Sequence, residues 1–514
     1  MFGISPVGTF AGSNAPPSDT SMVKAKTHFF KNDNLSTVLE PADNSAVFCG
    51  TKIMTTLGPS THDPNTMDTL LNSGMVAGRV DLTWGPLEFH ANSLRLLEAA
   101  MKRQRRLCAI AIDTMGRELM IRGQWQINEQ GYPWVLGRND VQVGKRIAIT
   151  TREVTADSNT LPIMYPKFTS MVIPGDTIYI ARYLISGAES SSVYFKVESV
   201  TETDVICIAQ NEAVLDGLLC VFHVERSAGG AVQNAQNELP LLADWDKHCI
   251  EQLGKEFEVD FINLSYCRSA ADVREAHEFL RSIGMGSTKV LAKIETRQAL
   301  LNFQAILSEA DGIIISRGNL GLDVEPEKMA LVQKTLIQAC NLVGKPVIIT
   351  RVVDTMVHTP RPTRAEATDV ANAVLDGVDG ILLGAETLRG KYSVESVQTV
   401  ASICRAAEAV FDHSSHYSSL IDAAWEAVSQ ATATINSAEE SDGSFDDGDN
   451  RTSLSLQMVA NANPSDMPGG HVHLAKRNSF ASAVKRPQVH HAARNSYASA
   501  VEIDGAGPST TAVK

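Results

Sequence analysis

Short apolar runs alternate with amphipathic segments from residue 51 onward, and this alternation constrains the fold more than any other feature. Each run is bounded by Gly, Pro or polar residues and is apolar on both sides, which is typical of a parallel strand covered on both faces. Eight strands that are each followed by a helix predict an α/β protein with a (β/α)8 TIM barrel. The eight predicted strands are residues 52–57, 76–83, 108–113, 260–266, 289–295, 312–316, 346–350 and 380–386.

The segments between these strands carry recognisable helix ends. Asp63 and Pro64 form an N-cap and a first-turn proline, and Gly74 ends the same predicted helix. Another helix is expected to begin at Pro326 and to run towards Gly344. In a barrel of this kind the chemistry lies at the carboxyl ends of the strands, so the residues that follow each strand are the candidates for function.

One interval interrupts the alternation. Between Arg117 and about Pro240, short β-like runs punctuated by Gly, Asn and Asp replace the helices. This pattern predicts a small β domain inserted after the third strand, which is either a mobile cap over the barrel mouth or a passive decoration. The expected domains are an N-terminal extension, partly disordered, at 1–45, the catalytic barrel at 46–117 and 241–412, an inserted β-barrel cap domain at 118–240, a short helical segment at 413–435, and a disordered low-complexity tail at 436–514.

The tail is predicted to be disordered because of its composition. Acidic residues gather between 439 and 449, and the remainder is rich in Ser, Ala, Asn and Pro with few large apolar side chains. Such a segment cannot bury enough surface to offset the entropy of ordering it. Residues 477–484 are echoed by residues 494–501, which we interpret as leftover duplication in preference to paired docking or phosphorylation sites.

The net charge and the lengths of the apolar runs exclude several classes of function. The 514 residues carry 59 acidic and 45 basic side chains, a formal net charge of -14, which argues against binding to nucleic acid or to an anionic membrane. No apolar run approaches the roughly 20 residues that cross a bilayer. The first 22 residues lack the plan of a secretory or transit signal, so we expect a cytoplasmic protein. The eight cysteines form no Cys-x-x-Cys pair, which predicts reduced, buried thiols.

Charged and polar residues collect where the predicted strands end. A packed barrel has no structural need for this many charged groups at one rim, so we expect them to serve a site. The residues that we single out are Arg79, Asp81, Thr83, Asp113, Thr114, Glu118, Lys293, Glu295, Gly318, Asn319 and Thr350.

Lys293 and Glu295 are two positions apart on a strand and therefore project to the same side. A carboxylate can hold a hard divalent cation while an ammonium faces a shared anion, which suits phosphoryl transfer. A buried ion pair explains these two residues equally well when they are taken alone. Gly318 and Asn319 follow a strand and present backbone N–H groups to an anion, although one glycine is weak evidence. The sequence has neither a P-loop nor a Rossmann glycine motif.

A second group of residues offers only oxygen ligands. Asp81 and Asp113 supply carboxylates, and Thr83 and Thr114 supply hydroxyls, with no thiolate or imidazole beside them. This set favours an oxygen-preferring cation over zinc or copper. Caps at the starts of the following helices are the structural alternative, and for either threonine alone we prefer that alternative.

Five longer segments carry a family resemblance. They are Thr51-Lys52-Ile53, Ala292-Lys293-Ile294-Glu295, Ser316-Arg317-Gly318-Asn319-Leu320-Gly321, Arg361-Pro362-Thr363-Arg364-Ala365-Glu366, and the run from Asp369 to Gly377. In this order they resemble the pyruvate kinase family, and most of all its plant-type cytosolic branch, over about residues 22–416. The resemblance implies a phosphotransferase that moves the phosphoryl group of phosphoenolpyruvate to ADP and gives pyruvate and ATP, the last step of glycolysis.

The resemblance also implies roles for individual residues. Lys293 would neutralise the transferring phosphoryl group and the developing enolate, and Arg79 would grip the phosphate. The backbone at Gly318 and Asn319, with the hydroxyl of Thr350, would receive the substrate carboxylate region or relay a proton. The metal ligands that it implies are Glu295 and Asn319 for Mg²⁺, and Asp81, Thr83, Asp113 and Thr114 for K⁺, with Glu118 at the position where a glutamate accompanies potassium dependence.

The sequence departs from the family at several of these positions. Asn319 stands where most members have Asp, and because it lacks a charge we expect weaker Mg²⁺ binding. Arg117 replaces a proline and would either restore a positive charge near the nucleotide phosphates or obstruct them. The other replacements are Asp81, Thr83 and Trp84 for Asn, Ser and His, and Met115 and Met120 for Lys and Arg.

The largest departure is at the C-terminus. Family members continue into an α/β domain that binds effectors and builds a subunit interface, and here that domain is expected to be missing or replaced by the tail. Our first hypothesis is an active pyruvate kinase that binds phosphoenolpyruvate and ADP, either as a homo-oligomer or in association with full-length pyruvate kinase subunits. The alternative is a catalytically weak or inactive relative that acts as a regulatory or interaction subunit. Another phosphoenolpyruvate-using barrel enzyme is a third interpretation, disfavoured by the inserted cap and the matched segments.

Overall fold

The computed structural model describes residues 49–123, 126–127, 133–134, 138–184, 191–228, 231–422 and 425. The predictions for residues 1–45 and 436–514, including the duplicated segment, lie outside the described residues. The chain divides into two compact units, residues 1–412 and 413–514. In the second unit, residues 413–422 are helical.

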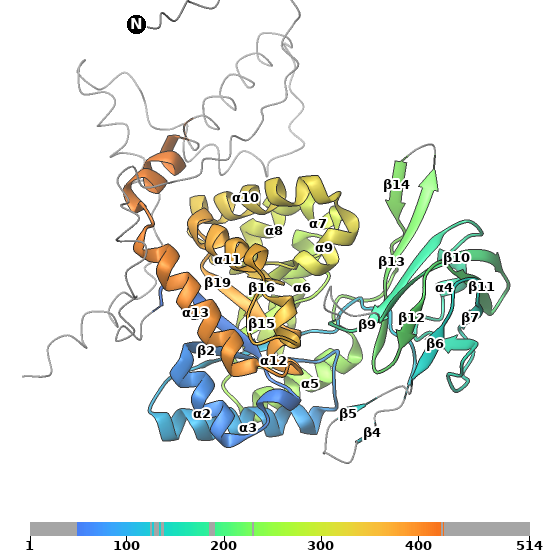
Figure 1. Ribbon diagram of the computed structural model, residues 1–514, viewed down its shortest axis with the longest axis horizontal. Helices are drawn as coiled ribbons and strands as arrows, with labels where there is room; N and C mark the ends of the chain where they lie inside the picture. Colours follow the sequence, from blue (N-terminus) through green and yellow to red (C-terminus); the bar gives the residue numbers. More distant parts are fainter. Residues whose placement is uncertain are drawn as a thin grey trace, which may run out of the picture. The chain divides into compact units, whose positions relative to one another are not determined.

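Eight parallel strands close into a barrel in the first unit, which confirms the predicted (β/α)8 fold (Figure 1). Around the barrel each strand pairs with the next in chain order, and the last strand pairs with the first. The strands are β1 (Lys52–Thr56), β2 (Met75–Asp81), β3 (Ala109–Asp113), β15 (Phe261–Leu264), β16 (Lys289–Ile294), β17 (Gly312–Ile315), β18 (Val347–Thr350) and β19 (Gly380–Leu383).

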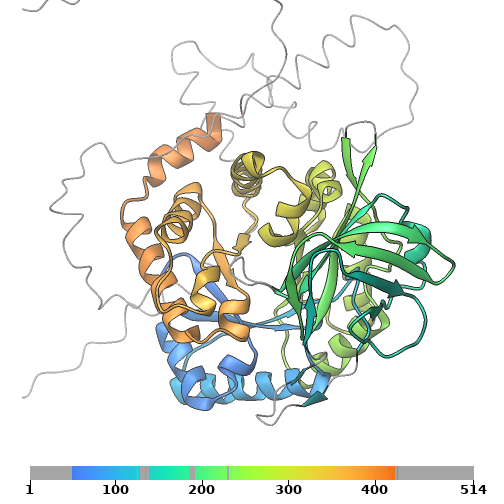
Figure 2. The ribbon, with the colours of Figure 1, turned by 45° about the vertical axis from the view of Figure 1, so that its right-hand side comes forward.

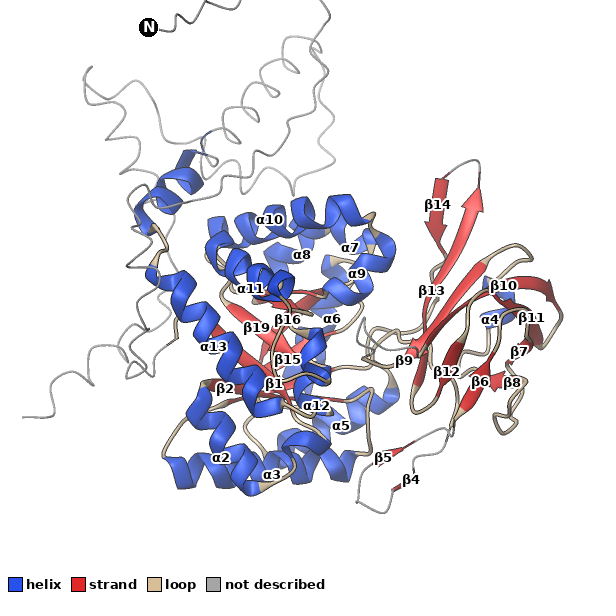
Figure 3. Cartoon of the chain, viewed as in Figure 1, coloured by secondary structure: helices blue, strands red, loops and turns tan. Residues whose placement is uncertain are grey.

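Helices connect the barrel strands and surround them (Figure 3). As predicted, the Asp63 side chain caps α2 by accepting a 2.8 Å hydrogen bond from the Thr66 backbone N–H, and Gly74 ends the helix with a φ of 116°. The helices are α2 (Pro64–Ser73), α3 (Leu87–Gln104), α5 (Asp244–Glu256), α6 (Ala270–Ser282), α7 (Arg297–Leu301), α8 (Phe303–Glu309), α9 (Arg317–Asp323), α10 (Pro326–Val343), α11 (Arg364–Asp376), α12 (Ala385–Leu388) and α13 (Ser393–Ala409), with the 3-10 turns η1 (Pro59–Thr61) and η2 (Asp354–Val357).

The barrel strands are apolar on both faces because each face packs against a different layer. A small inner cluster fills the barrel, with Met54, Leu291, Ile314 and Leu382 among its buried members. A much larger cluster fills the space between the strands and the helices. This packing leaves the polar side chains of the strands to the ends, where the site lies.

The predicted β domain is inserted between β3 and α5, and we call it the cap. It contains a seven-stranded sheet in the order β14-β13-β9-β10-β11-β7-β8 and two separate pairs of strands. Figure 2 shows it as a distinct lobe beside the barrel, and it has an apolar core of its own around Phe168 and Phe195. Its elements are β4 (Gln126–Ile127), β5 (Pro133–Trp134), β6 (Asn139–Val141), β7 (Arg146–Thr150), β8 (Thr160–Pro162), α4 (Phe168–Met171), β9 (Thr177–Arg182), β10 (Ser192–Val200), β11 (Asp204–Ala209), β12 (Ala213–Leu215), β13 (Leu219–Ala228) and β14 (Ala231–Asn234).

Two further expectations concern membrane crossing and the cysteines. No helix in the described ranges has the length and apolar character that crossing a membrane would require. All eight cysteines are free thiols, and seven of them are buried, as the sequence predicts.

Candidate active site

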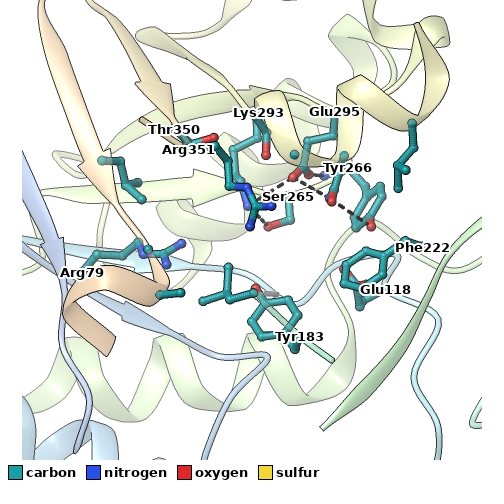
Figure 4. Close-up of a pocket in the computed structure, with 18 of the residues that line it drawn as sticks. Arg79, Glu118, Tyr183, Phe222, Ser265, Tyr266, Lys293, Glu295, Thr350 and Arg351 are labelled. Atoms are coloured by element: carbon teal, nitrogen blue, oxygen red, sulfur yellow. Dashed lines mark hydrogen bonds and ion pairs between the residues drawn. The ribbon is translucent and has the colours of Figure 1, made fainter. Parts of the chain in front are cut away.

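A cavity of about 170 Å³ lies at the carboxyl ends of the barrel strands, beside the cap (Figure 4). Residues of the barrel and of the cap line this cavity, and those of the cap include Tyr179, Tyr183 and Phe222. Seven of the eleven site residues predicted from the sequence line this cavity, namely Arg79, Glu118, Lys293, Glu295, Gly318, Asn319 and Thr350. The remaining four, Asp81, Thr83, Asp113 and Thr114, are buried next to it at the ends of β2 and β3.

Lys293 stands near the end of β16 and is almost fully buried. Its Nζ atom donates a 3.0 Å hydrogen bond to Ser265 Oγ and lies 3.1 Å from Asp113 Oδ2 and 3.4 Å from Glu295 Oε1. Burial alone would lower the pKa of Lys293, but the carboxylates of Glu295 and Asp113 hold it above the usual lysine value. The side chain is therefore a stable ammonium ion at neutral pH.

Glu295 projects to the same side as Lys293, as strand alternation predicts. Its Oε2 atom accepts a 2.6 Å hydrogen bond from the Tyr266 backbone N–H, and its Oε1 atom accepts one of 3.1 Å from Asn319 Nδ2. The structure thus brings together the two residues expected to bind Mg²⁺. A buried carboxylate beside an amide provides oxygen donors of the kind that this hard cation prefers, although no group of three or more His, Cys, Asp or Glu side chains in the described ranges could hold a metal ion.

Arg79 is 3% exposed and lies beside both predicted carboxylates. Its Nη1 atom is 2.6 Å from Asp113 Oδ2, its Nη2 atom is 3.3 Å from Asp81 Oδ2, and its Nε atom donates to Thr56 Oγ1 at 2.9 Å. Although burial opposes ionisation of Asp113, Arg79 and Lys293 hold its pKa below the ordinary aspartate value. Burial raises the pKa of Asp81, against the opposing effect of Arg79. Asp113 is therefore the carboxylate that links the two buried cations.

The four predicted K⁺ ligands come together in one buried region. The Thr83 backbone N–H donates to Asp81 Oδ1 at 3.1 Å, and Thr114 Oγ1 accepts from the Ser265 backbone N–H at 3.0 Å. The N-caps of the helices that follow are Pro86 before α3 and Ala243 before α5, so neither threonine is a cap and that alternative is not supported. Carboxylate and hydroxyl oxygens gathered in this way fit a hard cation.

Glu118 lies on the segment that leads from β3 into the cap and is 7% exposed. Burial and the neighbouring Glu295 carboxylate raise its pKa to about 8. Its Oε1 atom is buried and has no hydrogen-bond partner among the described residues. A buried oxygen atom without a hydrogen-bond partner can bind a cation or accept a hydrogen bond from a bound molecule.

Thr350 ends β18, and Gly318 and Asn319 belong to the first turn of α9, which follows β17. Arg317 connects these elements. Its backbone N–H donates to Thr350 Oγ1 at 3.2 Å and its Nε atom donates to the Thr350 carbonyl at 2.8 Å. The Thr350 hydroxyl and the first-turn N–H groups of α9 consequently meet at the same cavity.

Three residues that contribute to the site were not predicted from the sequence. Ser265 and Tyr266 end the fourth predicted strand, so the rule applied to the other strands would have found them. Tyr183 comes from the cap, and its hydroxyl donates a 2.9 Å hydrogen bond to Asp81 Oδ2. No sequence signal identifies Tyr183, because its role depends on how the cap meets the barrel.

Arg117 is held by contacts within the chain. Its guanidinium forms an ion pair with Asp272 at 2.8 Å and donates to the backbone carbonyls of Tyr266 and Leu239. It is not among the residues that line the cavity. Arg117 therefore ties the segment that leads into the cap to the barrel and to the segment that returns from the cap. Met120 packs in an apolar cluster with Cys220, and Met115 lies against that cluster.

Known proteins are similar to this chain in sequence and in fold. The family described as "Pyruvate kinase, barrel domain" matches residues 49–397. Pyruvate kinase 2, cytosolic, of Oryza sativa subsp. indica is 42% identical over 405 residues, covering 79% of this chain and 74% of the relative. The pyruvate kinase of Eimeria tenella is 33% identical over 396 residues, covering 76% of this chain and 69% of the relative.

A solved structure gives the same result. The Cryptosporidium parvum pyruvate kinase in complex with ADP superposes with a TM-score of 0.64 at 28% identity, covering 75% of this chain and 73% of that chain. The barrel, the inserted cap and the sequence matches agree with the resemblance first seen in the five segments. The chain belongs to the pyruvate kinase family.

Proposed function

We propose that this chain catalyses transfer of the phosphoryl group of phosphoenolpyruvate to ADP, giving pyruvate and ATP, in the glycolysis of the cytoplasm. The observation that carries the proposal is the position of Lys293 Nζ, which lies between Asp113 and Glu295 in a cavity that Arg79 also lines. Phosphoryl transfer is catalysed mainly by positioning and by neutralising charge on the transferred group. Two buried cations at one cavity, together with bound metal ions, would supply that neutralisation.

Each residue then has a defined task. The Lys293 ammonium neutralises the transferring phosphoryl group and then the enolate oxygen, and the Arg79 guanidinium grips the phosphate. The backbone N–H groups of Gly318 and Asn319 receive the carboxylate of the substrate. The Thr350 hydroxyl, which accepts a hydrogen bond from the Arg317 N–H, would relay the proton that converts the enolate to pyruvate.

Two metal ions belong to this proposal. Glu295 and Asn319 would hold Mg²⁺, which when bound neutralises charge on the phosphoryl oxygens. The oxygen atoms of the K⁺ group, Asp81, Thr83, Asp113 and Thr114, would hold the monovalent ion. The buried, unpartnered Oε1 atom of Glu118 supports a nearby cation, because a cation would favour the ionised form of a carboxyl group whose pKa is raised.

The domain limits and the partners are part of the same proposal. The barrel at 46–117 and 241–412 carries the catalytic residues, and the cap at 118–240 covers the cavity. Phosphoenolpyruvate and ADP are the substrates, and the ADP complex of the Cryptosporidium parvum relative supports the second of these. The chain acts as a homo-oligomer or with full-length pyruvate kinase subunits.

One observation favours the alternative of a weak or inactive relative. Met115 and Met120, which stand where the resemblance leads us to expect Lys and Arg, contact an apolar cluster beside the cavity and bring no charge to it. A nucleotide diphosphate would therefore meet fewer cations here. On this alternative the chain binds metabolites or true pyruvate kinase subunits without turnover.

A coupled assay separates the two functions. Purified full-length chain is incubated with phosphoenolpyruvate, ADP, Mg²⁺ and K⁺, and pyruvate is followed through lactate dehydrogenase. Active enzyme should show turnover that disappears when any one of the four components is omitted. Absence of turnover in the complete mixture, together with binding to a pyruvate kinase subunit, would select the regulatory alternative. Mass spectrometry of the same sample confirms that the assayed chain includes the tail.

A further inference from the structure

Arg351 lines the cavity, although no role is predicted for it from the sequence. It directly follows β18, next to Thr350, and its side chain extends towards Ser265 and the head group of Lys293 (Figure 4). The side chain is 28% exposed, and its Nε atom lies 3.1 Å from Asp354 Oδ2 on η2. A third cationic side chain therefore reaches the cavity that Arg79 and Lys293 also line.

The backbone of Arg351 is held in a strained conformation. Its φ of 64° lies in the left-handed region, which costs a residue other than glycine on the order of 1–3 kcal/mol. Four described non-glycine residues have a positive φ, and three of them, Leu184, Tyr266 and Arg351, line this cavity. Strain concentrated at one cavity indicates that the positions of these side chains serve the site.

A dedicated ion pair maintains the strained turn. Arg317 Nη2 donates to the Arg351 carbonyl at 2.5 Å, while Arg317 Nε donates to the Thr350 carbonyl. Asp369 fixes Arg317 in turn through two hydrogen bonds of 2.9 and 2.6 Å. The carbonyls of two successive residues are thus bound by one guanidinium, which sets the direction in which the Arg351 side chain leaves the backbone.

The Arg351 side chain lies against Gly318. A Cβ atom placed on Gly318 would be 3.4 Å from Arg351 Nε, so the Arg351 side chain borders the space beside Gly318. Gly318 and Asn319 offer the backbone N–H groups to which we assign the carboxylate of the substrate. The guanidinium of Arg351 is therefore close to the carboxylate end of the bound molecule and opposite the phosphate end that Arg79 would grip.

The buried side chains of the site carry more negative than positive charge, so a further cation would favour the binding of an anionic substrate. The two buried cations, Arg79 and Lys293, already face three buried carboxylates, those of Asp81, Asp113 and Glu295. A substrate that carries both a phosphate and a carboxylate adds further negative charge to this group. A planar guanidinium binds a carboxylate through two parallel hydrogen bonds, which a lysine cannot reproduce.

We propose that Arg351 is a further substrate-binding residue, whose guanidinium binds the carboxylate of phosphoenolpyruvate. The inference rests on the proposed function, since it assigns a new ligand to the same substrate. It gives the chain a specificity for carboxylate-bearing phosphoesters, because a phosphoester without the carboxylate would leave Arg351 without its ligand. The three charged ends of the site would then be Arg79 for the phosphate, Lys293 for the transferred group and Arg351 for the carboxylate.

The test measures the Michaelis constants of Arg351→Gln and Arg351→Lys in the coupled assay, and phosphoenolpyruvate binding by calorimetry. Arg351→Gln should raise the KM for phosphoenolpyruvate about 10- to 100-fold, as expected for loss of a charged hydrogen bond, and leave the KM for ADP within about twofold. Arg351→Lys keeps the positive charge but lacks the planar guanidinium, so its KM for phosphoenolpyruvate should lie between those of wild type and Arg351→Gln. Arg274→Gln is the matched control, because it removes an exposed ion pair of 2.8 Å to Glu309 on the barrel helices.

The outcomes distinguish this inference from the function on which it rests. If the wild-type chain turns over and Arg351→Gln binds phosphoenolpyruvate as well as wild type, the inference is overturned and the function stands. An equal rise in both Michaelis constants would also overturn it, because a carboxylate ligand does not act on ADP. If the wild-type chain shows no turnover, calorimetry still decides the matter. Weaker binding in Arg351→Gln alone supports the inference, while no binding to the wild-type chain removes both proposals.

Discussion

The Nζ atom of Lys293 lies 3.4 Å from Oε1 of Glu295, and both side chains are at most 9% exposed. The contact follows from the two-residue period of a strand, which sends both side chains to the same side of the barrel mouth. Because both charges are buried, removing either one leaves the other without full compensation, at a cost of about 3–5 kcal/mol for a typical buried pair. Activity and stability are therefore coupled at this pair, and tests of either must measure both.

Replacing Lys293 with methionine should abolish turnover. The variant keeps most of the length of the side chain but removes the ammonium that faces the transferred group, and we expect kcat to fall by about 10³-fold in the coupled assay. Lys289→Met is the control, since Lys289 lies on the same strand β16 with its side chain 59% exposed. Circular dichroism must show folded protein in both variants. Unchanged turnover in folded Lys293→Met would refute the assigned role.

Replacing Asn319 with aspartate should tighten Mg²⁺ binding. The amide now donates to Glu295 Oε1 at 3.1 Å, and a carboxylate in its place would add a charged oxygen ligand. We expect the Mg²⁺ concentration for half-maximal turnover to fall about tenfold, equivalent to about 1.4 kcal/mol. Asn65→Asp is the control, because it adds the same negative charge at an exposed position of α2 and should leave the Mg²⁺ dependence unchanged. A Mg²⁺ dependence identical to that of wild type would argue against Asn319 as a ligand.

The pH dependence of stability should carry a contribution from Glu386. Burial and the nearby Asp354 carboxylate raise its pKa to about 7 from the ordinary value of 4.5. An acid with a raised pKa in the folded state stabilises the protein fully below pH 4.5, and this contribution is lost as the pH rises through 7. Glu386→Gln should therefore lose less stability than wild type between pH 5 and pH 8 in urea titrations. Parallel losses in the two proteins would contradict the assignment, and Glu395→Gln, at an exposed position, is the control.

Replacing Tyr183 with phenylalanine should weaken the contact between the cap and the barrel. The variant loses only the hydroxyl group, which donates the 2.9 Å hydrogen bond to Asp81 Oδ2 and also interacts with the Thr83 side chain. We expect the free energy of unfolding to fall by about 1–2 kcal/mol, and amide hydrogens in β9 to exchange faster. Tyr194→Phe alters a tyrosine on the neighbouring strand β10 that is 44% exposed and should change neither measurement. Equal exchange rates in wild type and Tyr183→Phe would show that the hydrogen bond does not hold the cap.

Replacing Arg351 with glycine should separate binding from stability. Glycine adopts a φ of 64° without strain, so the substitution relieves the left-handed turn while it removes the guanidinium. The ion pair with Asp354 is lost, but partly exposed pairs contribute little to stability. We expect an unfolding midpoint at or above that of wild type together with a raised KM for phosphoenolpyruvate. A lower midpoint with unchanged KM would mean that Arg351 serves the fold.

The barrel and the ion pair of Lys293 with Glu295 could be predicted because both depend on local sequence. Strands that are buried on both faces are continuous apolar runs, so all eight were identified to within a few residues of their observed ends. The approach of Lys293 to Glu295 follows from strand alternation alone. The meeting of Asp81 with Asp113 follows once β2 and β3 are neighbours in a barrel, since these two residues share one register position.

The remaining features depend on tertiary contacts that no local pattern encodes. Arg117 pairs with Asp272 at the start of α6, a partner more than a hundred residues away in the sequence. Tyr183 reaches Asp81 only because of how the cap meets the barrel. The left-handed turn at Arg351 is imposed by Arg317, and the sequence shows only an arginine after a strand.

The insertion point of the cap has a consequence for how the chain folds. β3 and β15 lie side by side in the barrel, yet the whole cap separates them along the chain. The entropy of closing a connection grows only slowly, by about 0.6 kcal/mol for each doubling of its length, so the finished barrel tolerates the interruption. The rate of assembly is more sensitive, because contacts between distant segments form slowly. The barrel strands therefore form two arcs, β1–β3 and β15–β19, and the two pairings that join these arcs, β3 with β15 and β1 with β19, should be the last to form.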